Sequence, residues 1–244
     1  MNEVPGQRRL VWPALVAASA MTLICAATAG VASSTAGAEL TRGPNPMELE
    51  RAAAVEIAGR WLSWPAGRVF PETVAYAAEQ GGREKARRVG ISPETRCDRA
   101  VDAALRGTLR KAGCRGVLRA TYLDALQGVV VTVGVAAFAG EEGAAAAKVA
   151  LSRKGRPTPG LLALAFRGTV TDRFTSAGRQ SGLVRQAGPY LVMATVGQVD
   201  GRPAKAVGEQ RPTVFAFAGD IADRVLAGLS TPARPDCGTP EWLC

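Results

Sequence analysis

The feature that most constrains this chain is an uncharged, mostly apolar run near its N-terminus. No residue from Leu10 to Ala38 carries a charge, and the run directly follows the basic pair Arg8-Arg9. A transmembrane helix needs about 20 consecutive apolar residues, and cationic residues beside such a segment tend to remain on the cytoplasmic side. The run therefore predicts an export or anchoring signal, with the rest of the chain outside the cytoplasm.

This signal has two interpretations. Ala36-Gly37-Ala38 has the A-x-A pattern of a cleavage site, and cleavage after Ala38 would release a secreted protein. Signal-peptide apolar cores usually span about 7–15 residues, and this run is longer. We therefore favour a single-pass protein of the cell membrane with its C-terminal domain outside, and secretion is the alternative. The expected segments are a cytoplasmic region 1–9, a transmembrane helix or signal core 10–32, a linker 33–46, an extracytoplasmic domain 47–230 and a tail 231–244.

Cysteine usage agrees with an oxidising compartment. Apart from Cys25 there are four cysteines, which allow two disulfides in three connectivities: Cys97, Cys114, Cys237 and Cys244. An unbroken helix over 98–112 would hold the first two more than ~20 Å apart, whereas a disulfide requires Cα atoms within roughly 7 Å. We favour Cys97–Cys114 and Cys237–Cys244, with the helix broken at Gly107. In the alternative, the tail stretches along an unbroken helix.

Hydrophobic periodicity predicts an α+β domain after the N-terminal helix, in which antiparallel strand pairs pack with helices. The β-branched run 129–138 is the strongest strand signal. The other expected strands are 70–77, 116–123, 161–166, 182–186 and 190–199, and the expected helices are 47–62, 98–112, 141–152 and 220–229. The charged run 83–88 is expected to form a loop or a short helix, and 214–218 fits either a strand or a helix.

Two features suggest an internal division of the domain. The basic, Pro-containing segment 153–160 is a candidate boundary between lobes. The string 135–141 resembles 214–220, and each precedes an expected helix. The domain is thus a candidate for two related halves, each a strand pair followed by a helix.

The residue types exclude several kinds of chemistry. The chain has no histidine, which removes Ser-His-Asp and Cys-His catalysis and His-containing metal sites. Paired C-x-x-C spacing and glycine-rich phosphate-binding motifs are also missing. The acidic pairs Glu141/Glu142 and Asp220/Asp223 remain, at helix starts where carboxylates stabilise the helix dipole. We therefore expect no metal, no cofactor and no catalytic residues.

Basic residues exceed acidic ones, giving a net charge of +9, and most of the cations are arginine. Arg106 and Arg110 are four residues apart on one expected helix, and Arg115 and Arg119 begin the next strand. These four arginines are candidates for a basic face that binds an anionic ligand, and a solvated surface is the alternative explanation. Nucleic acid is not expected as a partner, because no basic surface interleaved with aromatic residues is evident.

The sequence Gly113-Cys114-Arg115-Gly116-Val117-Leu118-Arg119-Ala120-Thr121-Tyr122, with the valine-rich strand that follows, resembles uncharacterised single-pass membrane proteins of high-GC Gram-positive bacteria. That group has no assigned activity, so the resemblance implies an exported or anchored protein and carries over no site residues. We expect a non-catalytic envelope protein that binds another envelope protein or an anionic polymer. The alternatives are a secreted carboxylate-dependent hydrolase of envelope polymer and a structural accessory subunit of another membrane protein.

Overall fold

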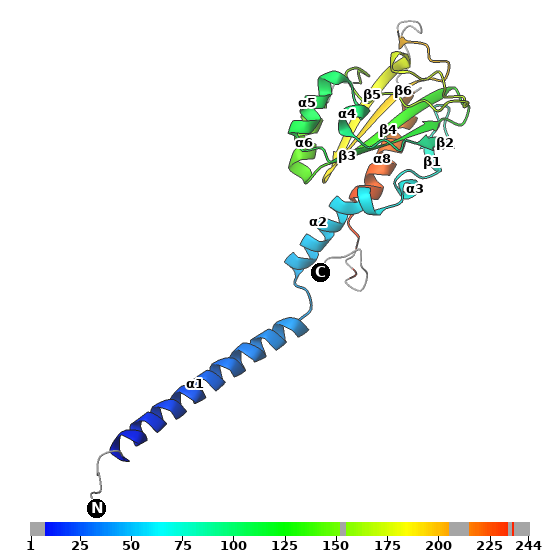
Figure 1. Cartoon of the computed structure of the whole chain (residues 1–244). Helices are drawn as coiled ribbons and strands as arrows, with labels where there is room; N and C mark the ends of the chain where they lie inside the picture. Colours follow the sequence, from blue (N-terminus) through cyan, green and yellow to red (C-terminus); the bar gives the residue numbers. More distant parts are fainter. Residues whose placement is uncertain (1–7, 152–154, 205–214, 234–235, 237–244) are drawn as a thin grey trace, which may run out of the picture. The chain divides into compact units, whose positions relative to one another are not determined.

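The computed structural model describes residues 8–151, 155–204, 215–233 and 236 (Figure 1). Its contacts divide the chain into two compact units, Met1–Leu49 and Glu50–Cys244. The predicted tail disulfide, Cys237–Cys244, falls outside the described residues. The prediction of an N-terminal apolar helix followed by an α+β domain is confirmed.

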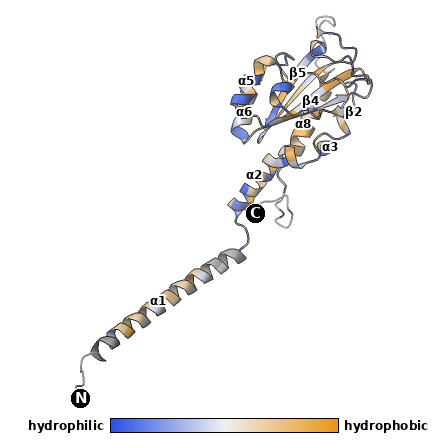
Figure 2. Cartoon of the chain, in the orientation of Figure 1, coloured by the Kyte–Doolittle hydropathy of each residue, from blue (hydrophilic) through white to orange (hydrophobic). Residues whose placement is uncertain are grey.

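The N-terminal unit is dominated by α1 (Arg8–Thr41). Its segment Trp12–Ser34 is long and apolar enough to cross a membrane, and a signal sequence would meet the same criteria (Figure 2). These 23 residues span roughly 35 Å at 1.5 Å per residue, compared with about 30 Å for the hydrocarbon core of a bilayer. The helix continues farther than predicted, so residues 42–45 alone connect it to the next helix, in place of the linker 33–46.

The second helix, α2 (Pro46–Ser63), begins with a reciprocal cap. The Asn45 side-chain oxygen accepts a hydrogen bond from the Glu48 backbone N–H at 3.0 Å, and the Glu48 carboxylate accepts one from the Asn45 N–H at 2.9 Å. This capping box satisfies two donors that the first helical turn leaves free. Proline in the first helical position costs no hydrogen bond there. The helix predicted over 47–62 therefore begins one residue earlier, at Pro46.

The domain is built on one antiparallel sheet. Its strands are β1 (Thr73–Ala77), β2 (Arg83–Ile91), β3 (Gly116–Leu123), β4 (Val129–Ala137), β5 (Arg179–Ala187) and β6 (Tyr190–Gln198). They lie in the order β1-β2-β3-β4-β6-β5. β4 pairs with β6 over its full length, so strands on both sides of the proposed boundary 153–160 share one sheet. The contacts also assign residues 50–244 to one compact unit.

One face of the sheet packs against α8 (Phe217–Ser230) and will be called the α8 face. Alternate residues of β4, Val131, Val133 and Val135, are buried here in one cluster with the apolar stripe of α8. α2 and the short α3 (Ala66–Val69) also pack at this side. The Trp61 ring lies against Gly116, where a Cβ would come within 2.4 Å of it.

All three tyrosines of the chain, Tyr76, Tyr122 and Tyr190, are buried in this cluster. Burial raises the pKa of Tyr76 and of Tyr190 to about 12, and it raises the pKa of Tyr122 as well. The folded state thus holds these protons more tightly than the unfolded state does, whose tyrosines titrate near pH ~10. Their stabilising contribution is complete below that pH and is lost as pH rises toward the folded values.

We therefore expect an alkaline titration of phenolate absorbance to show tyrosine ionisation above pH ~10, coincident with loss of tertiary structure. Near-UV circular dichroism recorded on the same samples reports the unfolding. Reversible ionisation of all three tyrosines near pH ~10, with the circular dichroism unchanged, would contradict their burial.

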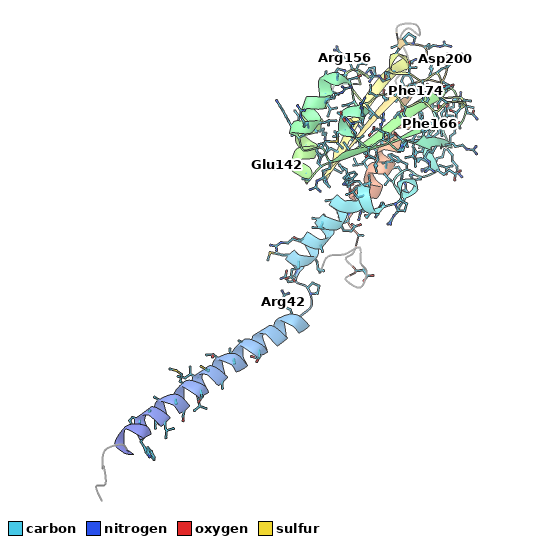
Figure 3. The ribbon with its side chains drawn as sticks, viewed as in Figure 1. Arg42, Glu142, Arg156, Phe166, Phe174 and Asp200 are labelled. Carbon is cyan, nitrogen blue, oxygen red and sulfur yellow. A yellow bond between two sulfur atoms is a disulfide. The ribbon has the colours of Figure 1, made fainter. Side chains whose placement is uncertain are left out.

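The opposite face is covered in two ways. Three helices lie at one side: α4 (Cys97–Ala100), α5 (Ala103–Lys111) and α6 (Glu141–Leu151). Residues 155–174, here called the strap, cross much of the remaining surface, and this face will be called the strap face. Figure 3 labels Phe166 and Phe174 of the strap.

Glycines on the sheet allow the strap to lie close. A Cβ on Gly182 of β5 would come within 3.0 Å of the Arg156 carbonyl oxygen, and one on Gly134 of β4 would come within 2.6 Å of Leu161. A Cβ on Gly90 of β2 would lie 2.5 Å from the Phe166 ring. Gly182, Gly134 and Gly90 lie beneath successive parts of the strap, from β5 across the sheet to β2. Because glycine has no side chain, the strap can approach the sheet closely at these three positions.

Buried polar groups fix the strap in place. Thr121 and Thr132 are cross-strand neighbours, and their hydroxyls lie 3.1 Å apart. The Thr121 hydroxyl donates to the Leu164 carbonyl at 2.7 Å, and the Leu164 N–H donates to the Thr132 hydroxyl at 3.0 Å. Because the backbone at Leu164 belongs to no strand ladder, its polar groups must be satisfied in another way, and these two threonines satisfy them.

A partly buried ion pair holds the other end of the strap. Arg179 donates to Asp102 at 2.9 and 3.1 Å and to the Leu161 carbonyl at 2.9 Å, and the Gly160 N–H donates to Asp102 at 2.7 Å. Burial alone would raise the pKa of Asp102, but the hydrogen bonds from Arg179 and Gly160 outweigh it and hold that pKa below its usual range. The pair connects β5, the strap and the start of α5.

Cys97 and Cys114 form a disulfide, as the sequence favoured, with Cα atoms 6.4 Å apart. The helix between them is broken as that pairing requires, but the position predicted for the break is wrong. Gly107 lies inside α5, and the break falls at Val101 and Asp102. Val101 forms an isolated bridge with Leu161 of the strap, and the Leu162 N–H donates to the Ala100 carbonyl. A long-range contact therefore interrupts this helix.

Other strand predictions need correction. The run 83–88 forms most of β2, neither loop nor helix. Residues 161–166 form no regular strand, and Leu161 makes one bridge. The succession of strand pair and helix does recur, as β3–β4–α6 and β5–β6–α8, but α6 packs on the strap face and α8 on the opposite one (Figure 1). The remaining predicted helices and strands agree with the structure within a few residues at each end.

Candidate anion-binding site

A row of cations lies on the strap face at its uncovered margin. Because side chains alternate between the faces of a strand, Arg83, Lys85 and Arg87 of β2 project from the strap face, while Ala86 is buried on the α8 face. All three cations are exposed. We call Arg83, Lys85 and Arg87 the cationic row.

Small neutral residues flank the row. Ala77, Ala75 and Thr73 of the edge strand β1 are the cross-strand partners of Arg83, Lys85 and Arg87. All three β1 residues are exposed as well, so no helix or loop of the described residues covers this margin. Alternate residues on a strand are spaced by roughly 6.6 Å. The row is therefore a line of evenly spaced positive charges on an accessible surface.

The charges of the row are not neutralised within the described part of the chain. None of the three cations takes part in an ion pair there. The acids of β2 and of the β3–β4 turn each accept a hydrogen bond, Glu84 from Tyr76 and Asp124 from the Val129 N–H at 2.8 Å. Unpaired like charges on one surface produce a positive local potential that attracts anions.

A pocket of about 730 Å³ adjoins the row. Lys85, Arg87 and Thr73 line one side of it, and Thr169 and Val170 of the strap line another. The remaining lining residues are Arg88, Val89, Leu123, Asp124, Ala125 and Gln127. Small-molecule sites commonly occupy about 300–1,000 Å³ and combine apolar walls with a few polar groups. Its size and lining are suited to a ligand that carries negative charge.

The structure exposes only three of the four arginines that the sequence proposed as a basic face. Arg106 and Arg110 are exposed on α5, and Arg115 is exposed just before β3. Arg119 is 7% exposed on β3, and burial lowers its pKa despite the opposing effect of Glu94. Arg119 therefore does not contribute to an exposed basic face. None of these four arginines lines the pocket beside the cationic row.

The acidic pairs named from the sequence have separate surroundings. Asp220 accepts a hydrogen bond from the Ala77 N–H at 2.8 Å, and Asp223 pairs with Arg185 at 3.2 Å. Glu141 and Glu142 are exposed at the start of α6 (Figure 3). These positions give Asp220 and Asp223 structural partners and leave the glutamates at the positive end of a helix dipole. No carboxylate pair facing across a cleft arises from these four residues.

Two further acids, Asp172 and Asp200, line a separate depression of about 630 Å³. Asp200 is bound by Arg202, which holds the pKa of the carboxyl below its usual range. A general acid would need its pKa raised instead. Among the described residues, no group of three or more His, Cys, Asp or Glu side chains is arranged for a metal ion.

The cationic row was missed at the sequence level because five of the residues at 83–91 are charged, which argued for a loop or a helix. The usable signal was the alternation Arg83-Glu84-Lys85-Ala86-Arg87, in which every second residue is basic. In a strand this period puts three like charges on one face. The pocket itself could not be found that way, because Thr169 and Val170 reach it from a distant part of the chain.

Comparison with known proteins adds no relative to this geometry. No protein-family model matches the chain, and no curated protein or solved structure matches it.

Proposed function

We propose that this chain is a membrane-anchored protein whose domain lies outside the cytoplasm and binds an anionic ligand of the cell envelope without catalysing a reaction. The observation that carries the proposal is the cationic row: Arg83, Lys85 and Arg87 are exposed, evenly spaced and without ion-pair partners among the described residues. Cations spaced in this way along one strand complement an extended anion with several charges better than an anion with one charge.

The proposed location rests on two separate features. The helix Trp12–Ser34 can cross a bilayer, and Arg8 and Arg9 precede it, which favours a cytoplasmic N-terminus. The Cys97–Cys114 disulfide is typical of extracytoplasmic compartments, since cytosolic thiols are kept reduced. Secretion after cleavage following Ala38 would place the same domain outside and leave its ligand-binding surface unchanged.

The test is binding of long-chain inorganic polyphosphate to the full chain held in phosphatidylcholine nanodiscs. We expect the triple variant Arg83→Gln, Lys85→Gln, Arg87→Gln to bind roughly a hundredfold more weakly, because each cation near an anionic surface contributes about 1 kcal/mol. The affinity of the unmodified chain should also fall steeply with added salt. Fluorescence anisotropy of end-labelled polyphosphate measures both effects.

The matched control is Arg106→Gln, Arg110→Gln, Arg115→Gln, which removes the same charge from three exposed arginines elsewhere. This control should retain affinity within about threefold, since distant surface charges are screened beyond roughly 10 Å. Equal losses in the two triple variants would mean that only net charge matters, and would contradict a defined site. Failure of the unmodified chain to bind polyphosphate would overturn the proposed function.

A further inference from the structure

We infer that the pocket beside the cationic row binds an anionic amphiphile, with its charged head at Lys85 and Arg87 and its apolar tail against Leu123, Val89 and Val170. This inference rests on the proposed function and names the class of ligand. It follows from the way the pocket combines two kinds of surface.

Charge and apolar surface meet directly across the β2–β3 pair. Arg87 is the cross-strand partner of Leu123, and both belong to the strap face. Directly opposed residues of an antiparallel pair have Cβ atoms about 5 Å apart. A cation and an apolar side chain thus lie side by side at the pocket, and Lys85 lies two residues farther along the same strand. A ligand that contacts both surfaces needs a negative group close to an apolar one.

The apolar part continues into the protein interior. Leu123 belongs to a small buried cluster with Val130 and Phe174, against which Val89 packs. Above this floor Val170 of the strap lines the pocket and is 47% exposed. Exposed apolar side chains gathered at a pocket often mark a ligand site. An apolar tail there would remove Val170 from water.

A purely polar anion would leave this part of the pocket unused. It would meet the row, but the lining residues Val89, Leu123, Ala125 and Val170 would gain nothing from it. A neutral apolar ligand would leave Lys85 and Arg87 without a counter-charge. An amphiphile with one anionic head uses both surfaces, and molecules of this chemistry occur wherever a membrane is near, as lipids or as lipid-linked phosphates.

The experiment compares three soluble probes by isothermal titration calorimetry on the full chain in phosphatidylcholine nanodiscs, with empty nanodiscs as the blank. The probes are octyl phosphate, inorganic phosphate (the head alone) and octanol (the tail alone). We expect octyl phosphate to bind at least about tenfold more tightly than phosphate, because burial of two methylenes already accounts for that factor. Octanol should give no heat beyond that of empty nanodiscs.

Variants separate the two surfaces. Lys85→Gln with Arg87→Gln should weaken octyl phosphate binding by about tenfold or more. Val170→Asn should weaken octyl phosphate but leave polyphosphate binding unchanged, because it alters only the apolar wall. Arg106→Gln with Arg110→Gln is the control and should change neither.

Each outcome distinguishes this inference from the proposed function. If polyphosphate binds, but octyl phosphate binds no more tightly than inorganic phosphate, the amphiphile is overturned. The proposed binding of an anionic ligand to the cationic row would then still stand. Octyl phosphate binding that Val170→Asn does not weaken would also overturn it, since the tail would then lie elsewhere. If neither polyphosphate nor octyl phosphate binds, both proposals fail.

Discussion

Replacing Arg60 with alanine should lower the free energy of unfolding by roughly 3–5 kcal/mol, the cost typical of breaking a buried ion pair by removing one partner. Arg60 is 2% exposed and pairs with Glu56, whose side chain is 9% exposed, at 2.6 Å. It also donates to the carbonyl oxygens of Leu229 and Thr231 at 2.9 and 2.8 Å. One side chain therefore joins α2 to the C-terminal end of α8.

The alanine variant would leave several groups unsatisfied at once. Glu56 would remain largely buried without a counter-charge, and the last carbonyls of α8 have no intrahelical donors of their own. Urea unfolding of the full chain in detergent, followed by tryptophan fluorescence, measures the change. Arg51→Ala is the control, because Arg51 is exposed on the same helix, and it should change stability by less than about 0.5 kcal/mol. A loss below about 1 kcal/mol for Arg60→Ala would contradict its role as the connection between α2 and α8.

Gly197→Ala should destabilise the domain by about 1–3 kcal/mol or more, the range for inserting atoms into a well-packed interior. Gly197 is buried in β6, and a Cβ there would lie 2.2 Å from the Gly178 carbonyl oxygen and 2.8 Å from the Phe174 ring. The first neighbour is backbone and cannot rotate away. β6 is an inner strand, paired with both β4 and β5, so the clash cannot be relieved by fraying an edge.

Gly107→Ala is the same substitution at another glycine, and we expect it to raise the stability of the domain. Gly107 lies inside α5, and a Cβ there meets no atom within 4 Å. Alanine should therefore stabilise the domain by about 0.5–1 kcal/mol through helix propensity. The same urea measurement compares the two variants. If Gly197→Ala proved as stable as the unmodified chain, this result would contradict the close approach of the Gly178 carbonyl oxygen to β6.

The strands predictable from the sequence are those whose pattern is dominated by burial. The range of β4 follows from its β-branched run, which is typical of a strand buried on both faces, and the range of β3 follows from apolar residues such as Val117, Leu118 and Tyr122. β2 was missed for the converse reason. Its strap face is exposed at Arg83, Lys85 and Arg87, so this part of β2 lacks the alternation of apolar and polar residues by which a half-buried strand is usually recognised.

The strap and the helix break depended on contacts that no local pattern reveals. Val101 ends α4 because Leu161 pairs with it across about 60 residues of chain. The glycines Gly90, Gly134 and Gly182 could each be seen as weak points in a strand, but their shared purpose appears only once the sheet order is known.

The candidate site shows the same division. Its charges could have been found by testing 83–91 as a strand, whereas its apolar wall at Val170 required the tertiary structure. Of the four arginines that the sequence grouped into a basic face, Arg106, Arg110 and Arg115 are exposed. The fourth, Arg119, was separated from them by burial, since strand alternation puts it on the covered strap face of β3.

The functional proposal depends most directly on the domain lying outside the cytoplasm while α1 anchors it. The decisive measurement is the intact mass of the chain recovered from carbonate-washed membranes, after alkylation of free thiols without reduction. We predict a species that retains residues 1–38, with Cys97 and Cys114 protected from alkylation by their disulfide. A chain in the soluble fraction beginning at Glu39 would contradict the anchor, and a membrane-bound chain with both cysteines alkylated would contradict a domain outside the cytoplasm.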